Sequence, residues 1–320
     1  MICRIGTGIP LLISRNSGKA GGNVASKRIR KKIKGTRHRL KIFKKIKIAD
    51  FVTMGNCMCG FLAMLSFRGR WGEYIGEKEL FFLPGIILIV FGMILDGVDG
   101  EVARWELKKF GVKNRIGHYL DSIADTITFC LAPAYLIYSV YAIPWDTASS
   151  GDIIINIVVI ITSLIVALFG MLRLAKFVSS AHKLDMFIGL PTPPNAFIIC
   201  VLCFLFHPNP STEENYWTMK IIICSIAILL AFLMVSDYKY PKIYGKVRTI
   251  FSGLVFLFII SLTLKVFNIK VWKDLTNMEI FGLNLSAVLA LGVALFYAIG
   301  SPVIMELKER KLVDLELDDD

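Results

Sequence analysis

Four aspartates lie between residues 96 and 125 at spacings that fit two helices. Asp96 and Asp99 are three positions apart, and Asp121 and Asp125 are four positions apart. Residues three or four apart lie on the same face of a helix, so each pair can point in one direction. Carboxylate oxygens are the ligands that Mg²⁺, Mn²⁺ and Ca²⁺ prefer. Two neighbouring antiparallel helices could therefore direct four carboxylates into one space that holds two divalent cations.

The residues between the aspartates suit phosphoryl transfer. Gly97 and Gly100 remove side-chain bulk beside the acids and let a phosphate group approach the helix closely. Arg104 offsets one negative charge at most, and bound cations would offset the remainder. Two metals that flank a phosphate stabilise both the entering and the leaving oxygen of an in-line displacement. Within an apolar stretch, this pattern predicts phosphoryl chemistry on a ligand that itself lies in a membrane.

Two other interpretations of the acids are open. The acids could be helix-end residues in a solvated loop, but their helical spacing, with Gly, Ala and Arg between them, argues against this. A proton or cation transporter could also use carboxylates within the membrane. A transporter built from repeats predicts polar segments in matching halves, and the stretch 150–265 has no second acid cluster. The cation transporter remains the alternative from a different functional class.

The elements that carry these residues are predicted to be transmembrane helices. Of the 320 residues, 55% are apolar, and the mean hydropathy is +0.62. Several apolar blocks reach the roughly 20 residues that a spanning helix needs. The blocks lie near 51–66, 81–95, 118–143, 153–172, 194–206, 219–235, 250–264 and 280–305. The sequence predicts an all-α integral membrane protein with eight transmembrane helices, give or take one.

Positive charge is concentrated before the first apolar block. Residues 1–50 contain fifteen Lys and Arg and one acid, so their net charge is +14. The whole chain has a net charge of +12, and the remaining residues therefore sum to −2. Such a cluster can bind nucleic acid. Because this cluster lies directly before a predicted membrane helix, we prefer the interpretation that it binds an anionic lipid surface. Membrane lipids are therefore expected partners, and nucleic acid is not.

The connecting loops alternate in charge. Lys and Arg are frequent near 104–117, 173–185 and 239–248, whereas 140–152 and 207–218 contain none. Because basic loops stay on the cytoplasmic side, we expect a multi-pass protein of the cell membrane with both termini and the acid cluster facing the cytoplasm. The predicted divisions are a basic, disordered segment 1–47, a core 48–248, two additional transmembrane helices within 249–305, and an acidic cytoplasmic tail 306–320.

At this point the residues resemble a known family. The stretches "DGVDGEVAR" (96–104) and "GHYLDSIAD" (117–125) resemble the signature of the CDP-alcohol phosphotransferases, D-x2-D-G-x2-A-R followed by G-x3-D-x3-D. Every defining position is filled. The spacer between Arg104 and Gly117 is longer than is usual in the family, which lengthens the basic loop between the two helices.

Three further segments resemble the phosphatidylserine synthase subgroup of bacterial and archaeal membranes. They are "TMGNCMCG" from Thr53 to Gly60, "RLAKF" followed by "FIGLPTPPNA", and "LMVSDYKYP". The resemblance runs from about residue 48 to about residue 265 and does not include the basic N-terminal segment. It implies a six-helix core with about two further C-terminal helices, and a homodimer.

The resemblance also implies a reaction. The donor would be CDP-diacylglycerol or CDP-archaeol, the acceptor the hydroxyl of L-serine, and the released product CMP. Glycerol phosphate, inositol phosphate and inositol are alternative acceptors for the same chemistry. Asp96, Asp99 and Asp121 would hold two divalent cations, Mg²⁺ or Mn²⁺, with help from Asp125. Asp125 would also act as the general base for the acceptor hydroxyl.

The remaining site assignments come from the same resemblance. The residues expected to bind the CDP-lipid are Thr53, Asn56, Gly100, Ala103, Arg104 and Gly117. Thr53 and Asn56 could instead hydrogen-bond another helix, and Arg104 could pair with an acid instead of a phosphate. Arg173 and Lys176 lie one helical turn apart and could hold the serine carboxylate. The other interpretation of these two is that they are basic residues anchoring the cytoplasmic side.

Overall fold

The computed structural model describes most of the chain between Lys47 and Glu306. The described residues are 47–68, 81–110, 115–145, 149–180, 187–207, 216–240, 279–280 and 283–306, with eight positions between 253 and 263. The predicted N-terminal segment, except Lys47, lies outside them, as do the predicted tail beyond Glu306 and 7 of the 15 positions of the apolar block 250–264. The proposed divisions at these points therefore stay predictions.

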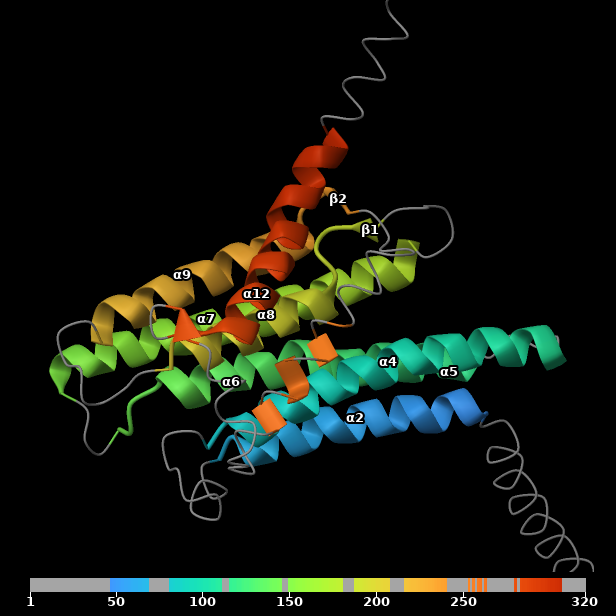
Figure 1. Cartoon of the computed structure of the whole chain (residues 1–320), viewed down its shortest axis with the longest axis horizontal. Coiled ribbons are helices and arrows are strands. Elements are labelled where there is room, and N and C mark those ends of the chain that lie inside the picture. Colours follow the sequence, from blue (N-terminus) through green and yellow to red (C-terminus); the bar gives the residue numbers. More distant parts are fainter. Residues whose placement is uncertain are drawn as a thin grey trace, which may run out of the picture. The chain divides into compact units, whose positions relative to one another are not determined.

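Helices make up nearly all of the described structure (Figure 1). They are α2 (Ile48–Ser66), α4 (Leu83–Phe110), α5 (Arg115–Asp125), the π-helical turn η2 (Thr126–Leu131), α6 (Ala132–Tyr141), α7 (Ser150–Ser180), α8 (Thr192–Leu205), α9 (Tyr216–Val235), α12 (Leu285–Leu295) and a second π-helical turn, η5 (Phe296–Gly300). Four two-residue strands form two antiparallel pairs: β1 (Phe187–Ile188) with β2 (Lys239–Tyr240), and β3 (Glu279–Ile280) with β4 (Leu283–Asn284).

The prediction of an all-α, multi-pass membrane protein is confirmed. Five helical segments of the described residues are long and apolar enough to cross a bilayer: Ile48–Ser66, Gly117–Tyr141, Ser150–Ser179, Trp217–Val235 and Ala287–Glu306. Helix α8 is apolar but has only 14 residues. Pro193 and Pro194 occupy its first turn, where their missing N–H groups cost no helical hydrogen bond.

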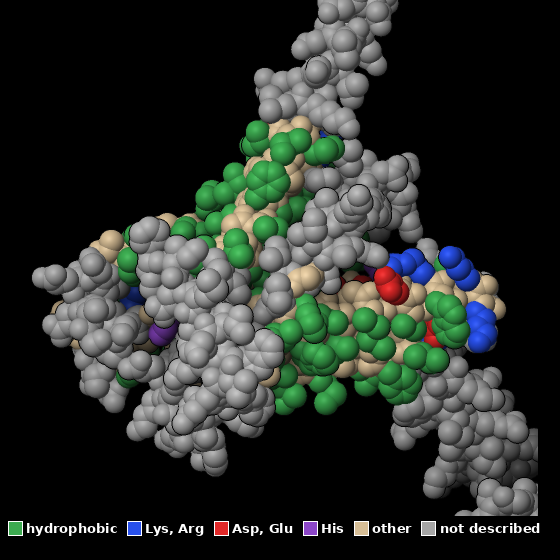
Figure 2. Space-filling view, viewed as in Figure 1, with side chains coloured by type: hydrophobic (Ala, Val, Ile, Leu, Met, Phe, Trp, Pro, Cys, Tyr) green, Lys and Arg blue, Asp and Glu red, His purple; other side chains and the backbone are tan. Residues whose placement is uncertain are grey.

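The outer flanks of the helices are apolar. On α7, Ile154, Ile161 and Leu168 recur every seventh residue and are all at least half exposed. Figure 2 shows hydrophobic side chains covering the visible flanks of the described helices, with Lys, Arg and acidic side chains gathered where α4 ends. A surface of this kind is stable against lipid chains, where the backbone polar groups are already satisfied within each helix.

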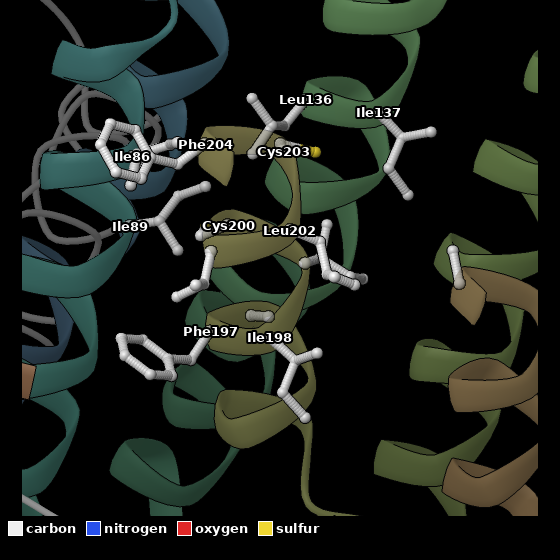
Figure 3. Close-up of a cluster of buried hydrophobic side chains, with 14 of the residues drawn as sticks. Ile86, Ile89, Leu136, Ile137, Phe197, Ile198, Cys200, Leu202, Cys203 and Phe204 are labelled. Atoms are coloured by element: carbon white, nitrogen blue, oxygen red, sulfur yellow. The ribbon is translucent and has the colours of Figure 1, made fainter. Parts of the chain in front are cut away.

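Helix α8 forms the centre of the core. Nearly all of its side chains are buried, including Phe197, Ile198 and Phe204. Figure 3 shows these side chains between α4, which contributes Ile86 and Ile89, and α6. A short helix that is apolar on every side suits this central position.

Two glycines allow α2, α4 and η2 to pack closely. A Cβ atom on Gly60 would lie 2.7 Å from the Cα of Thr128, and one on Gly92 would lie 2.8 Å from Oδ1 of Asn56. The hydroxyl of Thr128 donates a hydrogen bond of 2.9 Å to the carbonyl oxygen of Asn56. These contacts lie about one helical turn from the aspartates, so they set the distance between the helices that carry them.

A π-helical turn follows directly after Asp125. The N–H of Ala132 donates to the carbonyl oxygen of Ile127, five residues back. Pro133 comes next and has no N–H to continue the α-helical pattern. Single π-turns within helices are frequent at functional sites. Here the turn separates the acid-bearing α5 from the apolar α6.

The strand pair β1–β2 joins the loop before α8 to the segment after α9. Gly189, with φ 75°, donates its N–H to the carbonyl oxygen of Tyr238 at 2.9 Å. The hydroxyl of Tyr240 donates at 2.9 Å to the carbonyl oxygen of Ala298 in η5, and burial raises the pKa of Tyr240 to about 12. The loop before α8 and the segment after α9 therefore pack together through β1 and β2, and Tyr240 connects this strand pair to η5 by a hydrogen bond.

Candidate active site

Three of the four aspartates meet between α4 and α5. One carboxylate oxygen from each of Asp96, Asp99 and Asp121 lies within 4.8 Å of the other two. The side chain of Asp99 is only 5% exposed. Carboxylates this close repel one another, and a hard divalent cation between them would remove that repulsion. The donor set therefore fits a divalent metal ion.

Asp125 lies at the edge of this group. Its carboxyl group is in hydrogen-bonding contact with Asp96, and its charge also interacts with Asp121 and Asp99. Its Oδ1 is buried and has no hydrogen-bond partner among the described residues. A buried carboxylate oxygen without a donor is costly, so this atom is a natural contact for a cation or a substrate hydroxyl.

A pocket of about 270 Å³ opens beside the acids, between the start of α2, the second half of α4 and the start of α5. It is lined by Lys47, Ala49, Asp50, Thr53, Asp99, Gly100, Ala103, Arg104, Glu106, Leu107, Gly117, His118 and Asp121. Five of the six residues expected to bind the CDP-lipid are among these. The sixth, Asn56, is fully buried against Gly92 and does not line the pocket.

Thr53 connects the pocket to the acid cluster. Its hydroxyl lies 2.7 Å from Oδ2 of Asp99 and 3.1 Å from the carbonyl oxygen of Ala49, and it donates to Asp99 across the helix pair. A neutral donor that holds a metal-binding carboxylate in place is a frequent feature of metal sites.

Glu106 lines the pocket but was not among the predicted site residues. It is 3% exposed, and its Oε1 accepts a hydrogen bond of 2.9 Å from the backbone N–H of Ile48. The sequence did contain a signal for it, because Glu106 is seven positions after Asp99 and lies on the same helix face. An isolated glutamate beyond the family signature gave no reason to single it out.

The two candidate acceptor-binding residues have different surroundings. Arg173 is 6% exposed, its Nε has no hydrogen-bond partner within the described part of the chain, and its charge interacts with Asp125. Lys176, one turn later, forms a 2.5 Å ion pair with Asp237, and the side chains of that pair are 41% and 90% exposed. The structure thus brings Arg173 toward the acids and places Lys176 in a surface ion pair.

Comparison with known proteins agrees with the signature. Residues 46–231 match the model of the CDP-alcohol phosphatidyltransferase family. The chain is 33% identical to a CDP-diacylglycerol–serine O-phosphatidyltransferase of Methanocaldococcus jannaschii, over 71% of this chain and 87% of that protein. It is 32% identical to the protein of the same name from Bacillus subtilis, over 61% of this chain and 89% of the relative.

An archaetidylserine synthase of Methanothermobacter thermautotrophicus is 29% identical over 64% of this chain and 74% of that protein. The family match includes every helix from α2 to α8 and most of α9, and therefore the acid cluster and the pocket beside it. Both the signature aspartates and their arrangement in space thus lead to the same assignment, and the chain belongs to the CDP-alcohol phosphatidyltransferase family.

Proposed function

We propose that this protein transfers the lipid-bearing phosphate of a CDP-lipid to the hydroxyl of L-serine and releases CMP. Two of the relatives named above are CDP-diacylglycerol–serine O-phosphatidyltransferases, and the third is an archaetidylserine synthase. The observation that carries the choice of acceptor is the buried guanidinium group of Arg173, whose charge interacts with Asp125.

The donor would occupy the pocket beside the acid cluster. Its diphosphate would lie next to Gly100 and Ala103, which have little side-chain bulk of their own and line the pocket. Arg104, which also lines the pocket, can offset phosphate charge. The lipid chains would then extend into the bilayer along the apolar flanks.

Asp96, Asp99, Asp121 and Asp125 would hold two divalent cations, Mg²⁺ or Mn²⁺. When bound, such ions neutralise the diphosphate and stabilise the entering and leaving oxygens of the displacement. Thr53 contributes by fixing the orientation of the Asp99 carboxylate.

Asp125 would accept the proton of the serine hydroxyl, since its Oδ1 is buried without a donor. The hydroxyl oxygen would form a bond to the lipid-bearing phosphorus, and the bond between that phosphorus and the oxygen bridging to CMP would break. The proton stays on Asp125 until it is lost to water, and the electron pair of the broken bond leaves with CMP.

Arg173 would bind the carboxylate of serine. A guanidinium group can bind a carboxylate through two parallel hydrogen bonds, and burial strengthens that interaction. In the first turn of α8, Thr192 Oγ1 and the side-chain amide of Asn195 are also buried without hydrogen-bond partners in the described structure. A buried guanidinium group favours an acceptor with an anionic group over inositol, which carries no charge. The acceptor panel below separates serine from glycerol phosphate and inositol phosphate, whose phosphate groups Arg can also bind.

We place the site at the cytoplasmic face of the cell membrane. The amino-terminal end of α2, the carboxyl-terminal end of α4 and the start of α5 lie at the same end of the helices (Figure 1). The basic loops of the sequence adjoin these ends, and basic loops remain in the cytoplasm. A homodimer is part of the same proposal.

An acceptor panel tests the proposal. The purified full chain is incubated with CDP-diacylglycerol or CDP-archaeol and Mg²⁺ or Mn²⁺, and CMP release is measured with serine, glycerol phosphate, inositol phosphate or inositol. Among these acceptors, we expect only serine to support CMP release. CMP release that depends on another alcohol would show that serine is the wrong acceptor. Ion flux in liposomes without CMP release would favour a cation transporter.

A further inference from the structure

The pocket beside the acid cluster continues along α4 as far as Glu106. Asp99, Ala103 and Glu106 are at positions i, i+4 and i+7, so they follow one face of the helix, and all three line the pocket. At 1.5 Å per residue, about 10 Å of helix separates Asp99 from Glu106. A nucleoside diphosphate with its phosphates at the aspartates can place its base at that distance.

Glu106 has one oxygen engaged and one available. Its Oε1 accepts the hydrogen bond from the N–H of Ile48, the first residue of α2. No hydrogen bond to its Oε2 is found among the residues that the structure describes, and this oxygen is not one of their fully buried unpartnered atoms, so it can face the pocket that Glu106 lines. Burial of a carboxylate is costly unless its oxygens meet donors. Glu106 therefore offers a fixed acceptor to a ligand that brings a donor into the pocket.

Cytosine is a base that brings such a donor. Its exocyclic amino group N4 is a donor that Asp and Glu side chains accept from, whereas uracil has an acceptor, O4, in the same place. We propose that Oε2 of Glu106 accepts a hydrogen bond from N4 of the donor's cytosine and thereby selects CDP-lipids over UDP-lipids. This inference rests on the proposed function, because it assigns the base end of the same donor.

Capping of α2 is the competing explanation for a buried glutamate here. A negative charge at a helix N-terminus is stabilising, and one oxygen is enough to satisfy the N–H of Ile48. Replacement by glutamine separates the two roles. In Glu106→Gln the amide oxygen can still accept from Ile48, while the NH₂ group presents a donor to the pocket. That donor is mismatched with N4 of cytosine and matched with O4 of uracil.

The test measures binding of CDP and UDP to the full chain in detergent micelles by titration calorimetry, with Mg²⁺ present and without lipid or serine. We expect wild type to bind CDP more tightly than UDP by about tenfold or more. Glu106→Gln should lose most of that preference. Glu101→Gln removes the same charge from an exposed position of α4 outside the pocket and should keep the wild-type ratio.

An unchanged ratio in folded Glu106→Gln would overturn the proposal and leave Glu106 as a cap of α2. A crystal structure of wild type with CDP decides the question without any substitution, so a variant that fails to fold does not prevent the test. A distance from N4 to Oε2 of about 2.7–3.2 Å supports the proposal, and a base bound elsewhere overturns it.

The same data separate this inference from the proposed function. If serine is the wrong acceptor, both nucleotide affinities and the effect of Glu106→Gln remain as expected. A wild-type protein that binds neither nucleotide would overturn both proposals.

Discussion

Thr53 of α2 donates a hydrogen bond of 2.7 Å to Oδ2 of Asp99 on α4, and both side chains are at least 95% buried. The bond crosses the helix pair that forms one wall of the pocket. It holds a carboxylate of the acid cluster in one orientation, which a metal-binding carboxylate needs. Helix α2 is thus connected to the acid cluster although it carries none of the four aspartates.

Thr53→Val removes this hydroxyl and nearly preserves the shape of the side chain. We expect kcat/KM to fall about 10- to 100-fold, with a higher metal concentration needed for half-maximal activity. Thr53→Ser keeps the hydroxyl and should keep most of the activity. CMP release measured against Mg²⁺ and Mn²⁺ concentration tests this. A Thr53→Val enzyme with an unaltered metal dependence would mean that the bond only joins the two helices.

Removal of divalent metal should abolish the reaction. Without a cation, Asp96, Asp99 and Asp121 have carboxylate oxygens within 4.8 Å of one another, and a bound diphosphate would add to the repulsion. We expect no CMP release after treatment with EDTA and recovery when Mg²⁺ or Mn²⁺ is added back. Activity that persists under full chelation would exclude metal-dependent transfer.

Asp125→Asn tests the general base. The asparagine side chain occupies the same volume but cannot take up the proton of the serine hydroxyl. We expect kcat to fall by about 10²- to 10⁴-fold. Binding of CDP by titration calorimetry should fall less than kcat, because Asp96, Asp99 and Asp121 remain to hold the cations and Asp125 itself does not line the pocket. Near-normal kcat in this variant would remove Asp125 from the role of base.

The acid cluster could be predicted from the sequence because helical spacing alone determines which carboxylates share a face. The sequence predicted two neighbouring antiparallel helices for these acids, and in the structure α4 and α5 both pack against α2. Helical spacing places Glu106 on the same face as Asp99, but its contact with Ile48, 58 positions away in the sequence, could not be predicted. The different surroundings of Arg173 and Lys176 also depend on tertiary packing, since both residues are basic and only one turn apart.

Gly92→Ala tests how closely the acid-bearing helices must pack. An added Cβ would lie 2.7 Å from Cγ2 of Thr128 and 2.8 Å from Oδ1 of Asn56, both in fully buried side chains. Overpacking of this kind costs about 1–3 kcal/mol. Gly97→Ala, on the same helix, is the control, because a Cβ there meets nothing within 4 Å. Thermal unfolding in detergent should show a lower midpoint for Gly92→Ala alone, and equal midpoints for both variants would contradict the packing argument.

Arg173 and Lys176 provide a matched pair for testing the acceptor site. Arg173→Met removes a buried cation whose charge interacts with Asp125, so the KM for serine should rise at least about tenfold while CDP binding stays close to that of wild type. Lys176→Met breaks an exposed ion pair with Asp237, and such pairs contribute about 0–1 kcal/mol, so its kinetics should resemble wild type.

Arg173→Lys keeps the charge but loses the paired hydrogen bonds and should give an intermediate KM for serine. If the KM for serine rises in Lys176→Met and is unchanged in Arg173→Met, then Lys176, and not Arg173, binds the serine carboxylate.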